Sequence, residues 1–196
     1  QILNQQQLSV HQLDLISLAI GPGSFTGLRV GVVTAKSLAY AADVPVIAVN
    51  NLAASAAQLF AELEETDPCR VVKVGLNAQR QQLFTGSFQS VGDWEVQRND
   101  ADQIQTRDEF VSSLTEGQMV TGAGIKPIVE SIEAIGRGVT IADQKHWELS
   151  AVSIGQVGIK SYESGRRDDF WKIEPLYFRP SAAEELQIAR NADPLK

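Results

Sequence analysis

Two short apolar runs flank a glycine-rich segment in the first quarter of the chain. The runs cover residues 15–20 and 44–49, and both are rich in aliphatic residues. Runs of this length suit strands that are buried on both faces, as in a parallel sheet. The segment from Gly21 to Ala42 begins with a glycine- and proline-rich loop and continues as a helix-like pattern. The sequence therefore predicts a strand, loop, helix and strand in an α/β fold.

Small residues recur at every fourth position of the predicted helix, which places them on one ridge. They are Gly27, Gly31, Ala35 and Ala39. A glycine inside a helix costs about 1 kcal/mol relative to alanine, so two on one face need a structural reason. A flat ridge permits the close approach of another backbone, either of the chain's own sheet or of another protein. We expect an outward-facing partner interface, with Leu28, Val32 and Leu38 turned inward.

The loop before this helix is a candidate site for an anion or a nucleotide. Its residues include Gly21, Gly23, Ser24 and Thr26. Backbone amides at a helix N-terminus favour negatively charged groups. The loop lacks the third glycine of the dinucleotide fingerprint, and no Gly-Lys-Ser/Thr follows as in a P-loop. A tight turn that lets the helix pack on the sheet explains the same residues, so both interpretations stay open.

Cap residues and apolar runs predict the elements that follow. Asn50 or Asn51 can cap a helix directly after the second strand. Residues 71–76 and 83–88 are predicted to form a hairpin, with an edge strand at 94–97. These elements continue the α/β pattern.

The second half of the chain carries further cap signals. Thr106 and Glu109 have the spacing of a capping box. Short strands are predicted at 119–121 and 139–142, and Ser150 can cap a last helix. The charged residues after that helix are expected to form a solvated face. They are Arg166, Arg167, Asp168 and Asp169.

Composition limits the function classes. The net charge of −7 argues against a surface that binds nucleic acid on its own. The single cysteine, Cys69, permits neither an intramolecular disulfide nor a thiolate metal cluster. No run approaches the roughly 20 apolar residues of a membrane span. We expect a soluble, cytoplasmic protein, without a catalytic triad, because no nucleophile elbow accompanies His11 or His146.

Several motifs together resemble one family. Residues 21–31 read G-P-G-S-F-T-G-L-R-V-G and are followed by A-K-S-L-A and P-V-I-A-V-N. The resemblance continues through the hairpin near Asn77, the segment 121–124 and the closing 175–179. These motifs are similar to those of the TsaB (YeaZ) family, paralogues of the TsaD enzymes. The resemblance implies an actin-like, sugar-kinase-like α/β fold and a role in making threonylcarbamoyladenosine at position 37 of tRNA.

The resemblance also bears on domain organisation. Relatives start with a β-meander that carries an Asp-Thr motif, and this chain shows neither the meander nor the motif. We therefore expect a family member that lacks its N-terminal strands. Residues 1–100 are expected to form the first actin-like lobe, which is incomplete at its start. Residues 101–196 are expected to form a second, smaller lobe with a polar C-terminal tail from Glu184.

Two positions distinguish this chain from the TsaD enzymes. There, the matching Val-Asn is followed by two histidines four residues apart, which bind a metal from one helix face. Here these positions are Asn51 and Ser55, whose side chains are poor ligands for a transition metal. Relatives also commonly show Asp-Ala-Arg at the hairpin, where this chain has Asn77-Ala78-Gln79. We therefore expect no catalytic residue and no metal site.

The resemblance implies a non-catalytic subunit that binds and activates a TsaD-type enzyme, with a TsaE-type ATPase joining the complex. It implies a homodimer when the protein is alone, indirect contact with tRNA and no membrane association. No tightly bound cofactor is expected, and ATP or ADP within a complex stays an open alternative. An ATP-dependent phosphotransferase of the same fold is one rival. Such an enzyme needs an aspartate on its first strand, and this chain does not contain that aspartate. A metallopeptidase is the other rival, and the missing histidines count against it.

We expect the purified protein to bind no zinc or iron stoichiometrically, because Asn51 and Ser55 replace the two imidazoles. Elemental analysis after dialysis checks this expectation, and one metal ion per chain would contradict it. Combining Asn51→His with Ser55→His is expected to restore weak binding at most, since the remaining ligands and their supporting hydrogen bonds are not built.

Overall fold

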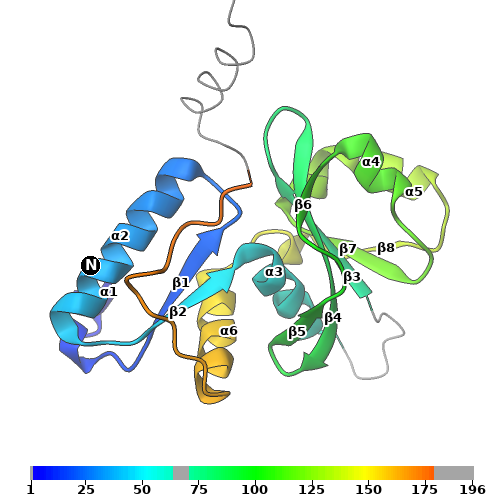
Figure 1. Cartoon of the computed structure of the whole chain (residues 1–196). Helices are drawn as coiled ribbons and strands as arrows, with labels where there is room; N and C mark the ends of the chain where they lie inside the picture. Colours follow the sequence, from blue (N-terminus) through cyan, green and yellow to red (C-terminus); the bar gives the residue numbers. More distant parts are fainter. Residues whose placement is uncertain (1, 64–70, 179–196) are drawn as a thin grey trace, which may run out of the picture.

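The computed structural model describes residues 2–63 and 71–178. It contains two sheets with helices packed between and around them (Figure 1). The first half of the described chain contains α1 (Ile2–Gln5), η1 (Val10–Gln12), β1 (Ile16–Gly21), α2 (Phe25–Ala42), β2 (Val46–Asn50) and α3 (Asn51–Phe60). No helix among the described residues is both long and apolar enough to span a membrane.

The second half contains the larger sheet. Its elements are β3 (Val71–Asn77), β4 (Gln82–Gly92), β5 (Glu95–Arg98), β6 (Gln103–Thr106), α4 (Arg107–Ser112), β7 (Gln118–Thr121), η2 (Ala123–Ile128), α5 (Val129–Ala134), β8 (Thr140–Ile141), η3 (Gln144–His146) and α6 (Ala151–Glu163). The strand order is β5-β4-β3-β7-β8, and β6 pairs with β4.

The predicted strand, loop, helix and strand unit is confirmed. Strands β1 and β2 are parallel, with Leu18 opposite Ala48, and α2 connects them. The Ser24 hydroxyl accepts a hydrogen bond from the Gly27 amide and so caps α2. Because side chains alternate along a strand, Val46 faces α2 while Ile47 faces the other side of the sheet.

The predicted caps and the hairpin are also confirmed. Strands β3 and β4 are antiparallel, and β5 forms an edge strand beside β4. Thr106 and Glu109 form the capping box of α4, and Ser150 caps α6. Strand β6 was not predicted, because its alternation of glutamines with Ile104 carries little hydrophobic signal.

The expected division into lobes at residue 100 falls between β5 and β6. Both strands pair with β4, so residues on the two sides of this boundary belong to one sheet. The assignment of lobes stays a prediction, and the predicted tail from Glu184 lies outside the described residues.

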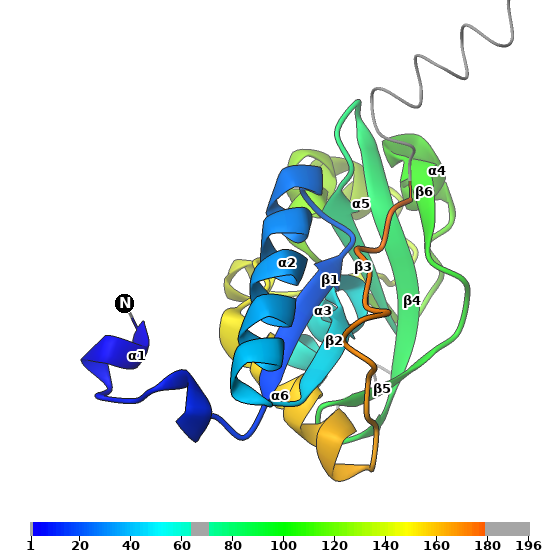
Figure 2. The ribbon, with the colours of Figure 1, turned by 60° about the vertical axis from the view of Figure 1, so that its left-hand side comes forward.

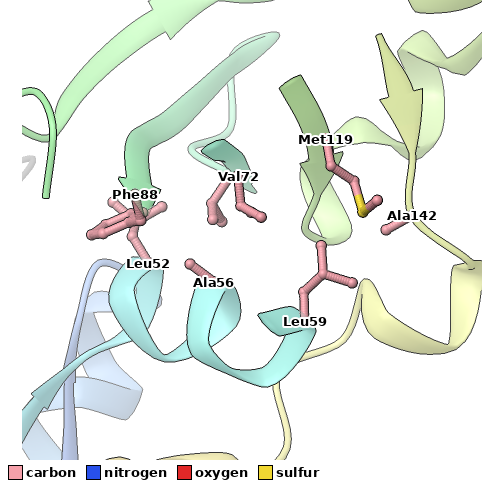
Figure 3. Packing of buried hydrophobic residues seen from close by; sticks show 8 residues of the cluster. Leu52, Ala56, Leu59, Val72, Phe88, Met119 and Ala142 are labelled. Atoms are coloured by element: carbon pink, nitrogen blue, oxygen red, sulfur yellow. The ribbon is translucent and has the colours of Figure 1, made fainter. Parts of the chain in front are cut away.

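Helix α3 lies between the two sheets. Leu52, Ala56 and Leu59 point towards Val72 and Phe88 of the larger sheet (Figure 3). On its other side, Ala54 packs with Ile47, Val49 and Ile154. The α3 N-cap is Asn50, whose side-chain oxygen accepts a hydrogen bond from the Ala53 amide. One short helix therefore contributes buried side chains to the hydrophobic cores of both sheets.

A carboxylate ties the two sheets at the start of α3. Asp102, in the connection between β5 and β6, accepts a hydrogen bond from Asn50 Nδ2 at 2.9 Å and pairs with Arg98 at 3.0 Å. Its second oxygen is buried without a hydrogen-bond partner. Burial raises the pKa of the Asp102 carboxyl, and the Asn50 hydrogen bond and the Arg98 charge oppose that rise.

Helix α6 approaches β1 closely at one glycine. A Cβ at position 158 would overlap the Ser17 hydroxyl, whereas a Cβ at position 155 would meet no atom within 4 Å. The two glycines therefore have different reasons to be there. Gly158 is needed for packing, and Gly155 only lowers the helical preference of α6.

We expect Gly158→Ala to lower the free energy of unfolding by about 1 to 3 kcal/mol, because the added methyl overpacks the contact with Ser17. The matched control, Gly155→Ala in the same helix, should raise the stability by about 0.5 to 1 kcal/mol. Urea denaturation measures both. Equal effects of the two substitutions would contradict the close approach of α6 to β1.

Asp102 should make stability depend on pH in a definite direction. Because its pKa is raised from 3.8, the folded chain keeps this proton where the unfolded chain has lost it. The stability that this group contributes is complete below pH 3.8 and is lost as the pH rises through the raised pKa. The free energy of unfolding of the wild type, minus that of Asp102→Asn, should therefore fall with increasing pH, as measured by urea denaturation between about pH 3 and pH 8.

Glu109→Gln is the control with the opposite sign. The Thr106 backbone N–H, followed by the Thr106 hydroxyl, lowers the pKa of Glu109 from 4.5. Its contribution is present above pH 4.5 and is lost as the pH falls through the lowered pKa. If the difference in unfolding free energy between the wild type and Asp102→Asn did not change with pH, burial would not control the titration of Asp102.

Candidate functional site

The glycine loop is held by packing and by α3. A Cβ on Gly21 would come within 2.9 Å of Leu28 Cδ1, and Gly21 has a positive φ of 116°. Asn51 Nδ2 donates a hydrogen bond to the Pro22 carbonyl at 3.1 Å. These contacts support the interpretation as a tight turn. Gly23, Ser24 and Thr26 are exposed, and an anion at their amides stays a prediction.

The ridge of small residues on α2 divides into two parts. Ala35 and Ala39 are buried in the core against Leu18 and Val46. The expectation that the whole ridge faces outward is wrong for these two alanines, because their small side chains let α2 pack closely on its own sheet. Gly27 is exposed and Gly31 is half-buried, and their role in a partner contact stays a prediction.

The outward side of α2 instead carries large apolar side chains. Val30, Val33 and Tyr40 are 62%, 64% and 70% exposed. Their spacing of three and seven residues places them along one side of the helix. We call these three residues the outer stripe. The outer stripe was not predicted, because the regular spacing of the small residues was interpreted as the outward side of the helix.

A segment that follows α6 runs back along the first sheet. Figures 1 and 2 show residues 166–178, which we call the strap, climbing from the end of α6 beside β2 and β1. The Leu176 amide donates to the Ile20 carbonyl at 2.7 Å, and Lys36 Nζ on α2 donates to the Trp171 carbonyl at 2.9 Å. The strap is therefore fixed to the sheet and to α2.

An ion pair attaches the start of the strap to β2. Asp168 Oδ2 accepts a hydrogen bond from the Ala48 amide at 2.8 Å, and Arg166 donates to the Ala48 carbonyl at 2.9 Å. Arg166 and Asp168 also pair with each other through two hydrogen bonds of 2.8 Å. The expectation of a purely solvated face is thus wrong for these two residues, because they satisfy backbone groups of β2.

Aromatic side chains extend the outer stripe at both ends of α2. Near its end, the Tyr40 ring lies 5.6 Å from the Trp171 ring, measured between centroids. Near its start, the Phe25 and Tyr177 rings lie 4.9 Å apart. All four residues are exposed, at 36% to 70%. The outer stripe and the strap therefore form one apolar and aromatic surface.

Asn51 and Ser55, which the resemblance places at the positions of two TsaD histidines, make structural contacts. Asn51 donates to the glycine loop, and the Ser55 hydroxyl donates to the Asn51 carbonyl at 2.9 Å. Asn51 Oδ1 is buried without a hydrogen-bond partner. Within residues 2–63 and 71–178, no group of three or more His, Cys, Asp or Glu is placed to hold a metal ion. Cys69 lies outside the described residues.

Sequence comparisons connect the chain to tRNA-modification proteins. The family model TsaD, tRNA N6-adenosine threonylcarbamoyltransferase, matches residues 1–112. A tRNA threonylcarbamoyladenosine biosynthesis protein TsaB from Haemophilus influenzae is 45% identical over 67 residues, which cover 34% of this chain and 28% of that protein. TsaB from Bacillus subtilis is 37% identical over 88 residues, covering 45% of this chain and 36% of that protein. The matches thus span about a third of these relatives.

Solved structures show the same fold. YeaZ from Pseudomonas aeruginosa aligns with a TM-score of 0.73 at 20% identity, covering 89% of this chain and 79% of that one. An uncharacterized protein with similarity to peptidase YEAZ, also from Pseudomonas aeruginosa, gives a TM-score of 0.72 at 20% identity, covering 91% and 79%. The predicted actin-like α/β fold is therefore confirmed.

The family model covers more than half of the 196 residues, and relatives named TsaB match parts of the chain at 45% and 37% identity. The chain therefore belongs to the family of TsaD and its TsaB (YeaZ) paralogues.

Proposed function

We propose that this chain is a non-catalytic subunit in the synthesis of threonylcarbamoyladenosine in tRNA. It binds a TsaD-type enzyme through the outer stripe of α2 and promotes the transfer reaction of that enzyme. The names of the relatives support the process, since TsaB is named for threonylcarbamoyladenosine biosynthesis and TsaD for threonylcarbamoyl transfer. The structure of α2 supports the mode of binding.

The observation that carries this proposal is the outer stripe. Val30, Val33 and Tyr40 place three large apolar side chains in solvent on one side of an 18-residue helix. Single exposed apolar residues are common, but an aligned set that continues into exposed aromatic residues is typical of a protein interface. A helix with such a stripe can pack against a helix of another chain by interlocking side-chain ridges.

The inner face of α2 explains how such an interface can form without loss of stability. Ala35 and Ala39 pack α2 against β1 and β2, whereas Val30 and Val33 are exposed and take no part in this core. The outward side can therefore bind a partner while the fold stays unchanged.

The chemistry is assigned to the partner. The side chains of Asn51 and Ser55, at the positions of the TsaD histidines, make internal hydrogen bonds. This argues against metal-dependent catalysis by this chain. The partner would bind tRNA, and a TsaE-type ATPase would join the complex with ATP or ADP. Self-association through α2 is the expected state of the protein alone.

We expect Val33→Glu to weaken binding to a TsaD-type enzyme by tenfold or more, about 1.4 kcal/mol, because a charge replaces an apolar contact at the centre of the interface. The matched control is Val152→Glu on α6, since Val152 is similarly exposed at 68% but lies on another helix. Isothermal titration calorimetry measures the affinity, and thermal melting checks that both variants stay folded.

The opposite ranking would contradict the proposal. If Val152→Glu abolished binding and Val33→Glu bound like the wild type, the interface would lie on α6. A wild-type protein that binds no TsaD-type enzyme and does not stimulate threonylcarbamoyl transfer would overturn the proposed function itself.

A further inference from the structure

Arg29 is held between two aromatic residues at the start of α2. Its guanidinium carbon lies 4.2 Å from the centroid of the Phe25 ring and 5.9 Å from that of the Tyr177 ring. Its Nε donates a hydrogen bond to the Tyr177 hydroxyl at 3.0 Å. One contact comes from the same helix and the other from the strap, so the orientation of the side chain is fixed from two elements.

The two terminal nitrogens of the Arg29 guanidinium group are available to bind another molecule. Among the described residues, neither terminal nitrogen of Arg29 has a hydrogen-bond or ion-pair partner, and the residue is exposed. Arg166, by contrast, uses its guanidinium to bind Asp168 and the Ala48 carbonyl. Arg29 therefore presents a pair of N–H donors to solvent in a fixed orientation beside the outer stripe.

A fixed guanidinium fork suits a carboxylate. Its parallel donors match the two oxygens of an Asp or Glu side chain, and the stacking on aromatic rings leaves less side-chain entropy to lose on binding. Arginine and aromatic residues are also the types that most often dominate interface energetics. The arrangement is that of a contact point for an acidic side chain.

The α2 helix of a second copy offers no carboxylate to Arg29. Between Phe25 and Ala42 the helix has two basic residues, Arg29 and Lys36, and no acidic residue. Packing α2 against α2 of a second copy would therefore bring basic residues together and provide no carboxylate from the helix itself. The net charge of −7 also disfavours an RNA phosphate as the ligand.

We infer that Arg29 is a specificity-determining residue of the proposed interface, which binds a carboxylate on a TsaD-type partner and favours that partner over a second copy of this chain. Tyr177 is a positioning residue, which holds the guanidinium group through its hydroxyl. This inference rests on the proposed function and adds to it the chemistry of recognition.

Substitutions at Arg29 test the inference with a purified TsaD-type enzyme of the same organism. Arg29→Gln should weaken binding at least tenfold and reduce its salt dependence, and Arg29→Lys should restore only part of the affinity, because lysine keeps the charge but lacks the planar fork. Lys126→Gln is the matched control, since it removes one positive charge from an exposed residue of η2, beside the larger sheet and away from α2 and the strap. It should bind like the wild type.

Tyr177→Phe separates positioning from bulk packing. The substitution keeps the ring and removes the acceptor of the Arg29 hydrogen bond. It should weaken binding in the wild-type background and have no further effect in Arg29→Gln, because the two residues act as one unit. Sedimentation should show that neither Tyr177→Phe nor Arg29→Gln weakens self-association.

Distinct outcomes would overturn the inference or the proposed function. If Arg29→Gln binds like the wild type while Val33→Glu does not, the inference about Arg29 is wrong and the proposed interface stands. If Arg29→Gln reduces self-association or tRNA binding instead, a second copy or a phosphate is the ligand and the inference is wrong. If the wild type itself does not bind the TsaD-type enzyme, the proposed function fails, and the inference fails with it.

Discussion

The burial of α3 between two sheets is the constraint on which the rest of the structure depends. Seven of its ten residues are buried, and its opposite sides contact cores that belong to different sheets. Gln58 can be buried there because it is fully hydrogen-bonded: its amide nitrogen donates to the Glu148 carbonyl, and its oxygen accepts from Ser150 and Ser153. The start of α6 is thereby fixed to α3, and α6 in turn covers β1.

This arrangement leaves α2 with a single covered side. The small side chains of Ala35 and Ala39 let α2 approach β1 and β2, and the strap closes the same region through its bonds to Ala48 and Ile20. The outer stripe remains uncovered, and Arg29 lies at its edge with its orientation already fixed. The proposed role in partner binding follows from this division between an inner face that supports the fold and an outer face that is free.

The sequence predicts those features that depend on local chemistry. The caps at Asn50, Thr106 and Ser150 and the short apolar runs mark elements whose stability depends on residues close together in the sequence. The direction of the small ridge was not predictable in this way, because close packing on the chain's own sheet and close packing on a partner require the same small residues. The strap was not predicted because its contacts are distant in sequence: Arg166 and Asp168 bind Ala48, which lies more than a hundred residues away. Strand β6 was not predicted because its apolar pattern is weak.

Hydrogen–deuterium exchange, compared between the free chain and its complex with a TsaD-type enzyme, tests the central claim most directly. The account predicts slower exchange on binding along α2 and in the strap, residues 166–178, with unchanged exchange in α6. Unchanged exchange in α2 and the strap, together with new protection in α6 or in the larger sheet, would contradict it.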